Sequence, residues 1–159
     1  MDKNRGFTLI EFIVVISIVL LFLGASLPRY NEYSTQLKLK SEGKKLVDVF
    51  ELAKKKALSA DLYEKSCSDF TGYRTTVTGS FYSLNFCCAG SCTGIEDYNF
   101  GNNITAISGI GNYNFTPLMI LPNFVGNSIR LKDSILGKCI DISISPIGVI
   151  ELNETLISC

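Results

Sequence analysis

The chain has 159 residues, 47% of them hydrophobic, and its 15 basic and 15 acidic side chains leave no net charge. It contains no histidine, which excludes catalysis by a histidine base or by a histidine-activated nucleophile. Residues 1–65 carry eleven basic and eight acidic side chains, whereas residues 66–159 carry four and seven. This mildly acidic C-terminal part offers no basic footprint for nucleic acid, so we do not expect DNA as a partner.

The N-terminus combines a short basic leader with a long apolar run. Lys3 and Arg5 lie just before Gly6, and the apolar run then extends to about residue 27. A helix of that length covers about 30 Å, the thickness of a bilayer core. We therefore predict a leader at residues 1–6 and a membrane-spanning helix at residues 7–28. The basic leader should stay in the cytoplasm and place the C-terminal part outside.

Glu11 is the only charged residue within this apolar run. An ionised carboxylate in hydrocarbon costs about 3 kcal/mol on insertion scales and marks a functional residue by default. Glu11 lies one turn into the span, so its side chain could simply extend to the interface. The alternative is a paired carboxylate, because buried charges are tolerated chiefly when they are paired. We favour the paired interpretation.

The order of leader charge, glycine, phenylalanine, glutamate and apolar run resembles the type IV pilin and pseudopilin superfamily. The processing motif of that superfamily, glycine followed by Phe-Thr-Leu-Ile-Glu, stands here at residues 6–11. The resemblance implies cleavage by a prepilin peptidase between Gly6 and Phe7, and methylation of the new Phe7 amine. It also implies that Glu11 pairs with the Phe7 amine of a neighbouring subunit. The expected partners are the peptidase, other pilin or pseudopilin subunits, and the inner membrane.

Pro28 lies where the apolar run ends and predicts a bend, because proline removes a backbone hydrogen bond from a helix. It begins a Pro-x-Tyr stretch similar to that of many pilins, so we count it with Glu11 as an assembly residue. A secretory signal is the competing interpretation, with a weak cleavage site at residues 24–26. A chain cut there would be an ordinary secreted domain.

Residues 29–65 continue the helix as an amphipathic segment. Apolar side chains recur at spacings of three, four or seven, at Leu39, Leu46, Phe50, Ala53, Ala57 and Ala60. The segment also holds a basic run at residues 54–56. We interpret this run as a solvated face rather than as a stripe that binds DNA or another partner.

Residues 66–159 are rich in Gly, Ser, Thr, Asn and β-branched residues and predict a β-rich head. The expected strands are residues 75–78, 81–86, 104–110, 115–121, 128–131, 139–145 and 147–152. A Gly-Ser turn should join the first two, and residues 88–103 should form a loop. The predicted fold class is therefore α+β: a long bent N-terminal helix packed on a C-terminal antiparallel β-sheet head, as in pilins.

An even number of cysteines in an exported domain predicts disulfides, with fifteen possible complete pairings. The six candidates are Cys67, Cys87, Cys88, Cys92, Cys139 and Cys159. Cys139 and Cys159 flank the last segment, and a bond between them would close a C-terminal loop of the kind that pilins often have. We expect Cys67 to bond one of the three central cysteines, and the adjacent Cys87 and Cys88 not to bond each other. Zinc binding by the central cluster is the alternative, but no histidine or paired knuckle supports it. We therefore expect no metal and no cofactor.

Two stretches are similar to the GspH/FimT-type pseudopilins and minor pilins. One is the Leu-x-x-x-Phe-x-x-Ala-x-x-x-Ala rhythm of residues 46–58, and the other is Ser-Pro-x-Gly at residues 145–148. The resemblances imply a structural subunit of a type IV pilus or of a type II secretion pseudopilus. It would sit in the inner membrane before assembly and afterwards on the cell surface or in the periplasm.

Two other functional classes compete with this interpretation. A minor subunit could act as a binding module for DNA uptake or adhesion, which the basic run favours and the acidic head disfavours. An exported enzyme is the other class. We do not expect it, because the sequence holds no recognisable catalytic constellation, P-loop or lipobox cysteine.

Overall fold

A long helix, α1 (Leu9–Leu58), precedes nine strands in the described part of the chain. The computed structural model describes residues 8–62, 66–117, 119–123, 128–145 and 148–159, without the side chains of 25–29 and 119–123. Its residues divide into two compact units, Met1–Gln36 and Leu37–Cys159. We call them the N-terminal unit and the C-terminal unit and describe each by itself.

The strands form two antiparallel sheets in the C-terminal unit. They are β1 (Phe70–Val77), β2 (Phe81–Cys88), β3 (Ser91–Asn99), β4 (Ile104–Ser108), β5 (Gly111–Thr116), β6 (Met119–Asn123), β7 (Ser128–Asp133), β8 (Lys138–Ile144) and β9 (Ile150–Ser158). One sheet has the order β3-β2-β1-β5-β6, and the other has the order β4-β7-β8-β9. The predicted fold class is confirmed, since a long N-terminal helix packs against antiparallel sheets in a pilin-like α+β fold.

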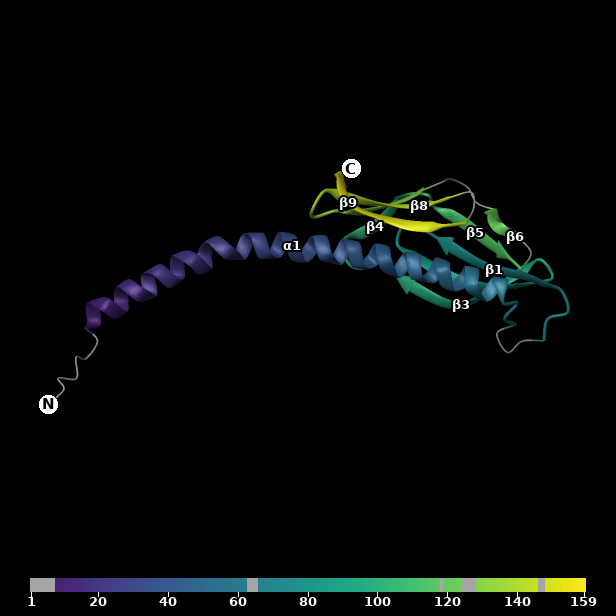
Figure 1. The fold of residues 1–159 in the computed structure, drawn as a ribbon, viewed down its shortest axis with the longest axis horizontal. Helices are drawn as coiled ribbons and strands as arrows, with labels where there is room; N and C mark the ends of the chain where they lie inside the picture. The colour runs from purple at the N-terminus through teal and green to yellow at the C-terminus, as the bar shows by residue number, and fades with distance from the viewer. Residues whose placement is uncertain (1–7, 63–65, 118, 124–127, 146–147) are drawn as a thin grey trace. The chain divides into compact units, whose positions relative to one another are not determined.

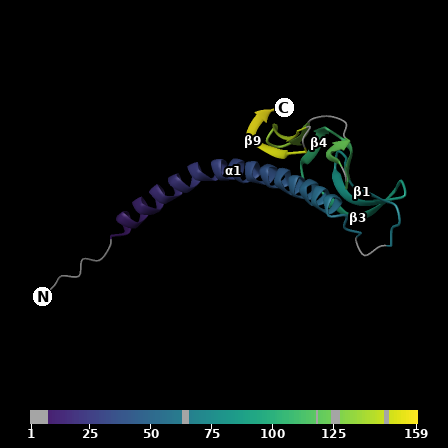
Figure 2. The ribbon, with the colours of Figure 1, turned by 45° about the vertical axis from the view of Figure 1, so that its right-hand side comes forward.

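The core of the C-terminal unit lies between the strands and the second half of α1 (Figures 1 and 2). Phe50 is completely buried, and its ring contacts those of Tyr113 and Phe115 on β5 at 4.9 and 6.0 Å. Gly43 brings the helix close to β9, because a Cβ at this position would lie 2.8 Å from Leu152 Cδ1. The apolar stripe of α1 is thus the face that covers the sheets.

The end of α1 comes earlier than the sequence predicts. Five of the six stripe residues are buried, but Ala60 is exposed and has φ 50°, the left-handed conformation that commonly terminates helices. The backbone N–H of Asp61 donates to Lys56 O at 3.1 Å and closes the last turn. Placing Ala60 on the stripe was therefore wrong, because the helix stops at Leu58.

The prediction of a loop at residues 88–103 is also wrong, because this segment contains β3. Ala89 and Gly90 both have positive φ, at 51° and 78°, so they form a two-residue turn that reverses the chain after β2. Further along, the strand predicted at 115–121 is divided between β5 and β6, which pair with each other. Both predictions failed at turns, because the pattern of apolar residues does not mark where a strand reverses direction.

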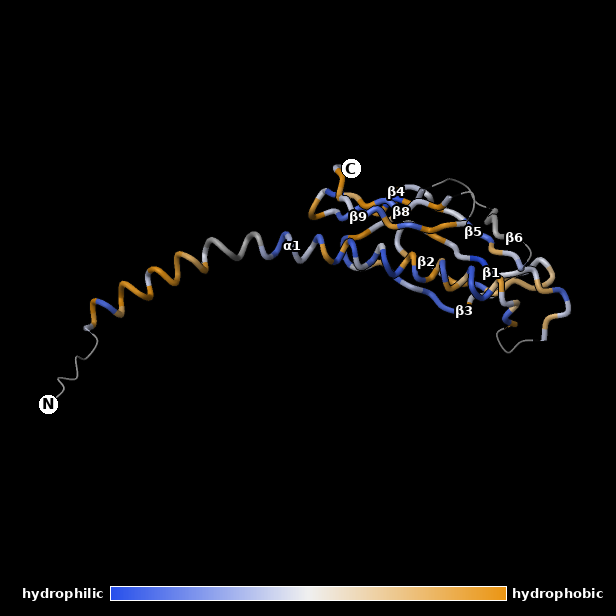
Figure 3. The backbone as a smooth tube through the Cα atoms, viewed as in Figure 1, coloured by the Kyte–Doolittle hydropathy of each residue, from blue (hydrophilic) through white to orange (hydrophobic). Residues whose placement is uncertain are grey.

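The two halves of α1 differ in hydropathy, as Figure 3 shows. The side chains described up to Gly24 are predominantly hydrophobic, whereas apolar and polar residues alternate from Leu37 onward. Within the described residues, no helix is both long and apolar enough to cross a membrane. The span predicted at residues 7–28 includes Phe7 and side chains outside that description, and it stays a prediction.

Three disulfides join all six cysteines, and all lie in the C-terminal unit. Cys67 bonds Cys88, Cys139 bonds Cys159, and Cys87 bonds Cys92 directly across the β2–β3 pair. The pairs 139–159 and 67–88 agree with the sequence-based expectation. These bonds leave no thiolate for zinc in the central cluster.

Candidate assembly site

Thr8 and Glu11 form a capping box at the start of α1. The Glu11 carboxylate accepts hydrogen bonds from the Thr8 backbone N–H at 2.9 Å and from the Thr8 hydroxyl at 2.8 Å. In return, the Glu11 backbone N–H donates to the Thr8 hydroxyl oxygen at 3.4 Å. This reciprocal arrangement satisfies donors that a helix start otherwise leaves without acceptors.

The capping box gives Glu11 a partner, Thr8, that was not predicted from the sequence. The signal was present as Thr-x-x-Glu at residues 8–11, the usual pattern of a helix N-terminus. Both donors from Thr8 are neutral, so they orient the carboxylate but do not neutralise its charge. The positive end of the helix dipole also favours a carboxylate in this first turn.

Apolar side chains surround Glu11 on every side of the helix. The large hydrophobic residues between Leu9 and Leu23 are 41 to 77% exposed, and none of them is buried within the chain. The two described polar side chains on this stretch of helix are satisfied locally, since the Ser17 hydroxyl donates to Ile13 O at 2.8 Å. A continuous exposed apolar surface from Leu9 to Leu23 is typical of a segment that contacts a membrane or another protein.

The structure does not fully describe the other residues predicted for the assembly site. Gly6 and Phe7 fall outside the described residues, and so does the side chain of Pro28, although residue 28 itself belongs to α1. The cleavage site, the methylated amine and the bend therefore stay predictions. The chemistry of the described site is that of a held carboxylate: it can accept hydrogen bonds or pair with a cation.

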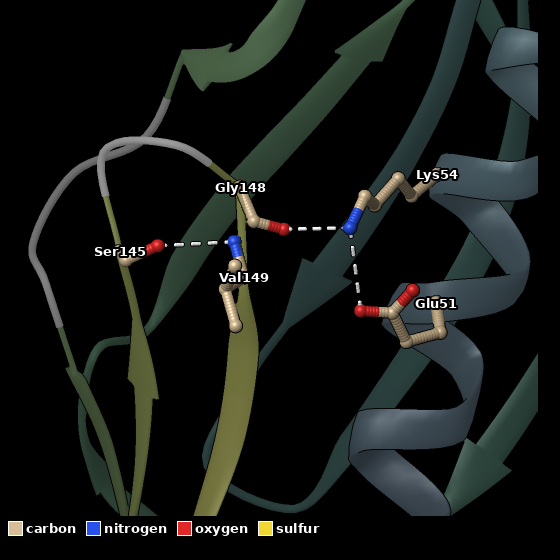
Figure 4. Close-up of polar contacts among 5 residues, drawn as sticks. All are labelled: Glu51, Lys54, Ser145, Gly148 and Val149. Carbon is tan, nitrogen blue, oxygen red and sulfur yellow. Dashed lines mark hydrogen bonds and ion pairs between the residues drawn. The ribbon is translucent and has the colours of Figure 1, made fainter.

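The basic run of α1 is largely committed to contacts inside the C-terminal unit. Lys54 Nζ donates to Gly148 O at 2.8 Å and pairs with Glu51 at 3.5 Å (Figure 4). The turn that presents Gly148 is closed by the Val149 N–H, which donates to Ser145 Oγ at 3.0 Å. Lys54 thus connects the helix to the turn between β8 and β9.

Lys56 also makes its contacts inside the C-terminal unit. Its ammonium pairs with Asp61 at 2.5 Å and lies 5.8 Å above the Tyr73 ring. Of the three lysines, only Lys55 has an exposed side chain. This arrangement favours neither a fully solvated face nor a continuous basic stripe for DNA.

Comparison with known proteins identifies the N-terminal segment. Residues 1–27 match the family described as the prokaryotic N-terminal methylation motif, and no curated protein and no solved structure matches the chain. The match ends before the C-terminal unit, so it does not test the resemblance to GspH/FimT-type subunits. The chain carries the N-terminal methylation motif of type IV pilins and pseudopilins, which implies a pilin-like subunit that a prepilin peptidase processes.

Proposed function

We propose that this protein is a structural subunit of a type IV pilus or of a type II secretion pseudopilus, assembled through its N-terminal helix. The observation that carries the proposal is the capped carboxylate of Glu11 within the exposed apolar surface, inside the methylation motif. Proteins with this motif are typically structural, and we do not propose an enzymatic activity.

Cleavage between Gly6 and Phe7 would create a cationic amine four residues before Glu11. Before assembly, Thr8 supplies neutral donors to the carboxylate. In the filament, the Phe7 amine of a neighbouring subunit would supply the opposite charge. Ion pairing is stronger in an apolar surrounding than in water, so the pair would favour correctly placed subunits over misplaced ones.

Before assembly, the apolar part of α1 would hold the subunit in the inner membrane with the C-terminal unit outside the cytoplasm. The three disulfides support this placement, because such bonds persist in oxidising compartments. After assembly, the subunit would reside on the cell surface or in a periplasmic pseudopilus.

The test is a set of three variants of the full chain in the producing cells. Glu11→Ala should leave membrane insertion and cleavage largely intact and should lower the amount of protein in sheared filaments. Glu11→Gln keeps hydrogen-bond acceptors for Thr8 but removes the charge, so it should fail like the alanine variant. Glu32→Ala changes an exposed carboxylate farther along the same helix and should assemble normally.

Two results would contradict the proposal. Normal filament incorporation of Glu11→Ala would exclude the pairing, and full rescue by Glu11→Gln would assign Glu11 to helix capping alone. The mass of the mature N-terminal peptide provides an independent check. A chain that begins at methylated Phe7 supports the proposal, whereas one that begins near residue 27 indicates a secretory signal.

A further inference from the structure

A small cavity lies on the outer face of the five-stranded sheet. Its volume is about 250 Å³, and its lining includes Arg74 on β1, Asn114 and Thr116 on β5, and the disulfide-bonded Cys87 and Cys92. Side chains alternate between the two faces of a strand. Tyr73, next to Arg74, and Phe115, between Asn114 and Thr116, have buried side chains on the inner face that packs on α1. The cavity therefore opens on the face of the sheet away from the helix.

Arg74 and Asn114 face each other across the paired strands β1 and β5. Arg74 Nε donates to Asn114 Oδ1 at 2.7 Å, which fixes the guanidinium and turns the amide nitrogen of Asn114 away from Arg74. No acidic side chain among the described residues pairs with Arg74. By contrast, Arg130 on β7 binds Asp141 through two nitrogens, at 2.7 and 2.8 Å.

Thr116 adds to the cavity a polar group that has no partner among the described residues. Its hydroxyl is buried and makes no hydrogen bond to any described residue. An unsatisfied buried hydroxyl costs about 1–3 kcal/mol. Thr75 has a similar hydroxyl, but its side chain lies in the core, whereas Thr116 lines the cavity.

These groups are complementary to a carboxylate. The guanidinium of Arg74 can bind a carboxylate through two parallel hydrogen bonds, and the Asn114 amide and the Thr116 hydroxyl can donate beside it. No Asp or Glu lines the cavity, although residues 66–159 are acidic overall. Arg74 is thus the one charged side chain among the described residues of the lining, and its charge favours a ligand of negative charge.

The size and position of the cavity narrow the class of ligand. Its volume is below the range of about 300–1,000 Å³ that is typical of pockets for drug-sized ligands. Strand β1 pairs with both β2 and β5, so the cavity offers no free strand edge to which a peptide could add. Asn114 and Thr116 can also exchange hydrogen bonds with sugar hydroxyls.

We propose that this cavity binds a small carboxylated saccharide of the uronic acid type, with Arg74 holding the carboxylate. The proposal is independent of filament assembly, because none of the lining residues belongs to the N-terminal unit. It gives the head a recognition function in addition to its structural role.

The test uses the full chain in neutral detergent micelles, with D-glucuronate as the probe and D-glucose as its uncharged counterpart. Isothermal titration should show at least tenfold tighter binding of glucuronate than of glucose. Arg74→Gln should weaken glucuronate binding at least tenfold. Arg130→Gln is the matched control, because it removes a guanidinium paired with Asp141 outside the cavity, and it should bind like the wild type.

Thr116→Val provides a second test that does not depend on the folding of the Arg74 variant. Valine has nearly the same shape but lacks the unpaired hydroxyl, so binding should weaken severalfold while the melting temperature stays equal or rises. Equal binding of glucose, absence of glucuronate binding to the folded wild type, or unchanged affinity in Thr116→Val would each overturn the proposal. Tighter binding of inorganic phosphate or of N-acetylalanine, which mimics a protein C-terminus, would also contradict it.

Discussion

The two units of this chain use the same helix in opposite ways. In the N-terminal unit the large apolar side chains are exposed; Leu9, for example, is 77% accessible. In the C-terminal unit Leu39 and Leu46 are completely buried against the sheets. Among the described residues, the first half of α1 therefore finds no cover for its apolar side chains, whereas the second half belongs to the core of the C-terminal unit.

The difference follows from the spacing of apolar residues. Residues 12–16 are apolar at every position, so every side of that helix is apolar, and no described residue of the unit covers it. From Leu39 onward, apolar residues recur every three or four positions and confine burial to one face. The predictions below test this division and the contacts that stabilise the C-terminal unit, in order of decreasing effect.

Phenylalanine occurs on both sides of the division and allows a direct test. Phe50→Ala should destabilise the C-terminal unit by about 3–5 kcal/mol, because it removes a buried ring that contacts Tyr113 and Phe115. Phe12→Ala, at a position 61% exposed, should change that stability by less than about 0.5 kcal/mol. Denaturant unfolding of the full chain in detergent, followed by near-UV circular dichroism, measures both. Equal losses would contradict the division.

A disulfide that closes a longer loop should contribute more to stability, although only logarithmically with loop length. Loop-closure entropy predicts a loss of about 3 kcal/mol when Cys139 and Cys159, separated by 20 residues, are both changed to alanine. The same change at Cys87 and Cys92, separated by 5 residues, should cost about 2 kcal/mol. Thermal unfolding of the two double variants measures the difference. The reverse order would show that packing, not loop closure, dominates.

The two glycines of α1 should respond differently to alanine. Gly43→Ala gains helix propensity but forces Leu152 to move, so we expect a net loss of about 1 kcal/mol in the C-terminal unit. A Cβ at Gly24 would meet no described atom within 4 Å outside its own stretch of helix, so Gly24→Ala should leave the unfolding midpoint of the C-terminal unit unchanged. A gain of stability in Gly43→Ala would show that Leu152 repacks without cost.

The smallest expected effect is electrostatic. Lys44 hydrogen-bonds Glu154 at 3.0 Å, and this bond with the charges of Lys44 and Lys40 lowers the pKa of the Glu154 carboxyl. A lowered pKa in the folded state gives stability that is present above the unfolded pKa of about 4.3 and is lost as the pH falls through the folded value. Glu154→Gln should slightly reduce the drop in melting temperature between pH 6 and pH 3.

Glu151→Gln is the matched control for this pH effect. Glu151 is exposed on the same strand and makes no ion pair within the described residues, so its variant should keep the pH dependence of the wild type. High salt should remove the difference between wild type and Glu154→Gln, because exposed pairs are screened. A difference that persists in 1 M salt would contradict an electrostatic origin.

The pattern of the sequence predicted most of the secondary structure but missed its irregular parts. The strands around Gly79 and Ser80 and the alternating strand β8 were predictable, because turn residues and period-two alternation mark them. Strand β3 was missed because its residues are mostly exposed and polar. It forms through backbone pairing with β2 and the bond between Cys87 and Cys92, neither of which requires an apolar pattern.

One candidate site could be predicted from the sequence, and the other could not. Glu11 was identified from the sequence, because a charge in an apolar run is conspicuous, whereas its capping partner Thr8 was recognised only in the structure. The cavity at Arg74 could not be predicted, because Arg74 and Asn114 are 40 residues apart and meet only when β1 pairs with β5. Its unpaired hydroxyl at Thr116 likewise becomes visible only in the folded chain.

The sequence by itself determined the long helix, the β-rich head and the methylation motif, because these depend on local spacing and on a contiguous pattern. Only the tertiary structure decided which of the three central cysteines bonds Cys67, that Lys54 holds the turn at Gly148, and which face of the sheet carries a cavity. The physical reason is that these features join residues distant in the chain, and strand register sets their distances.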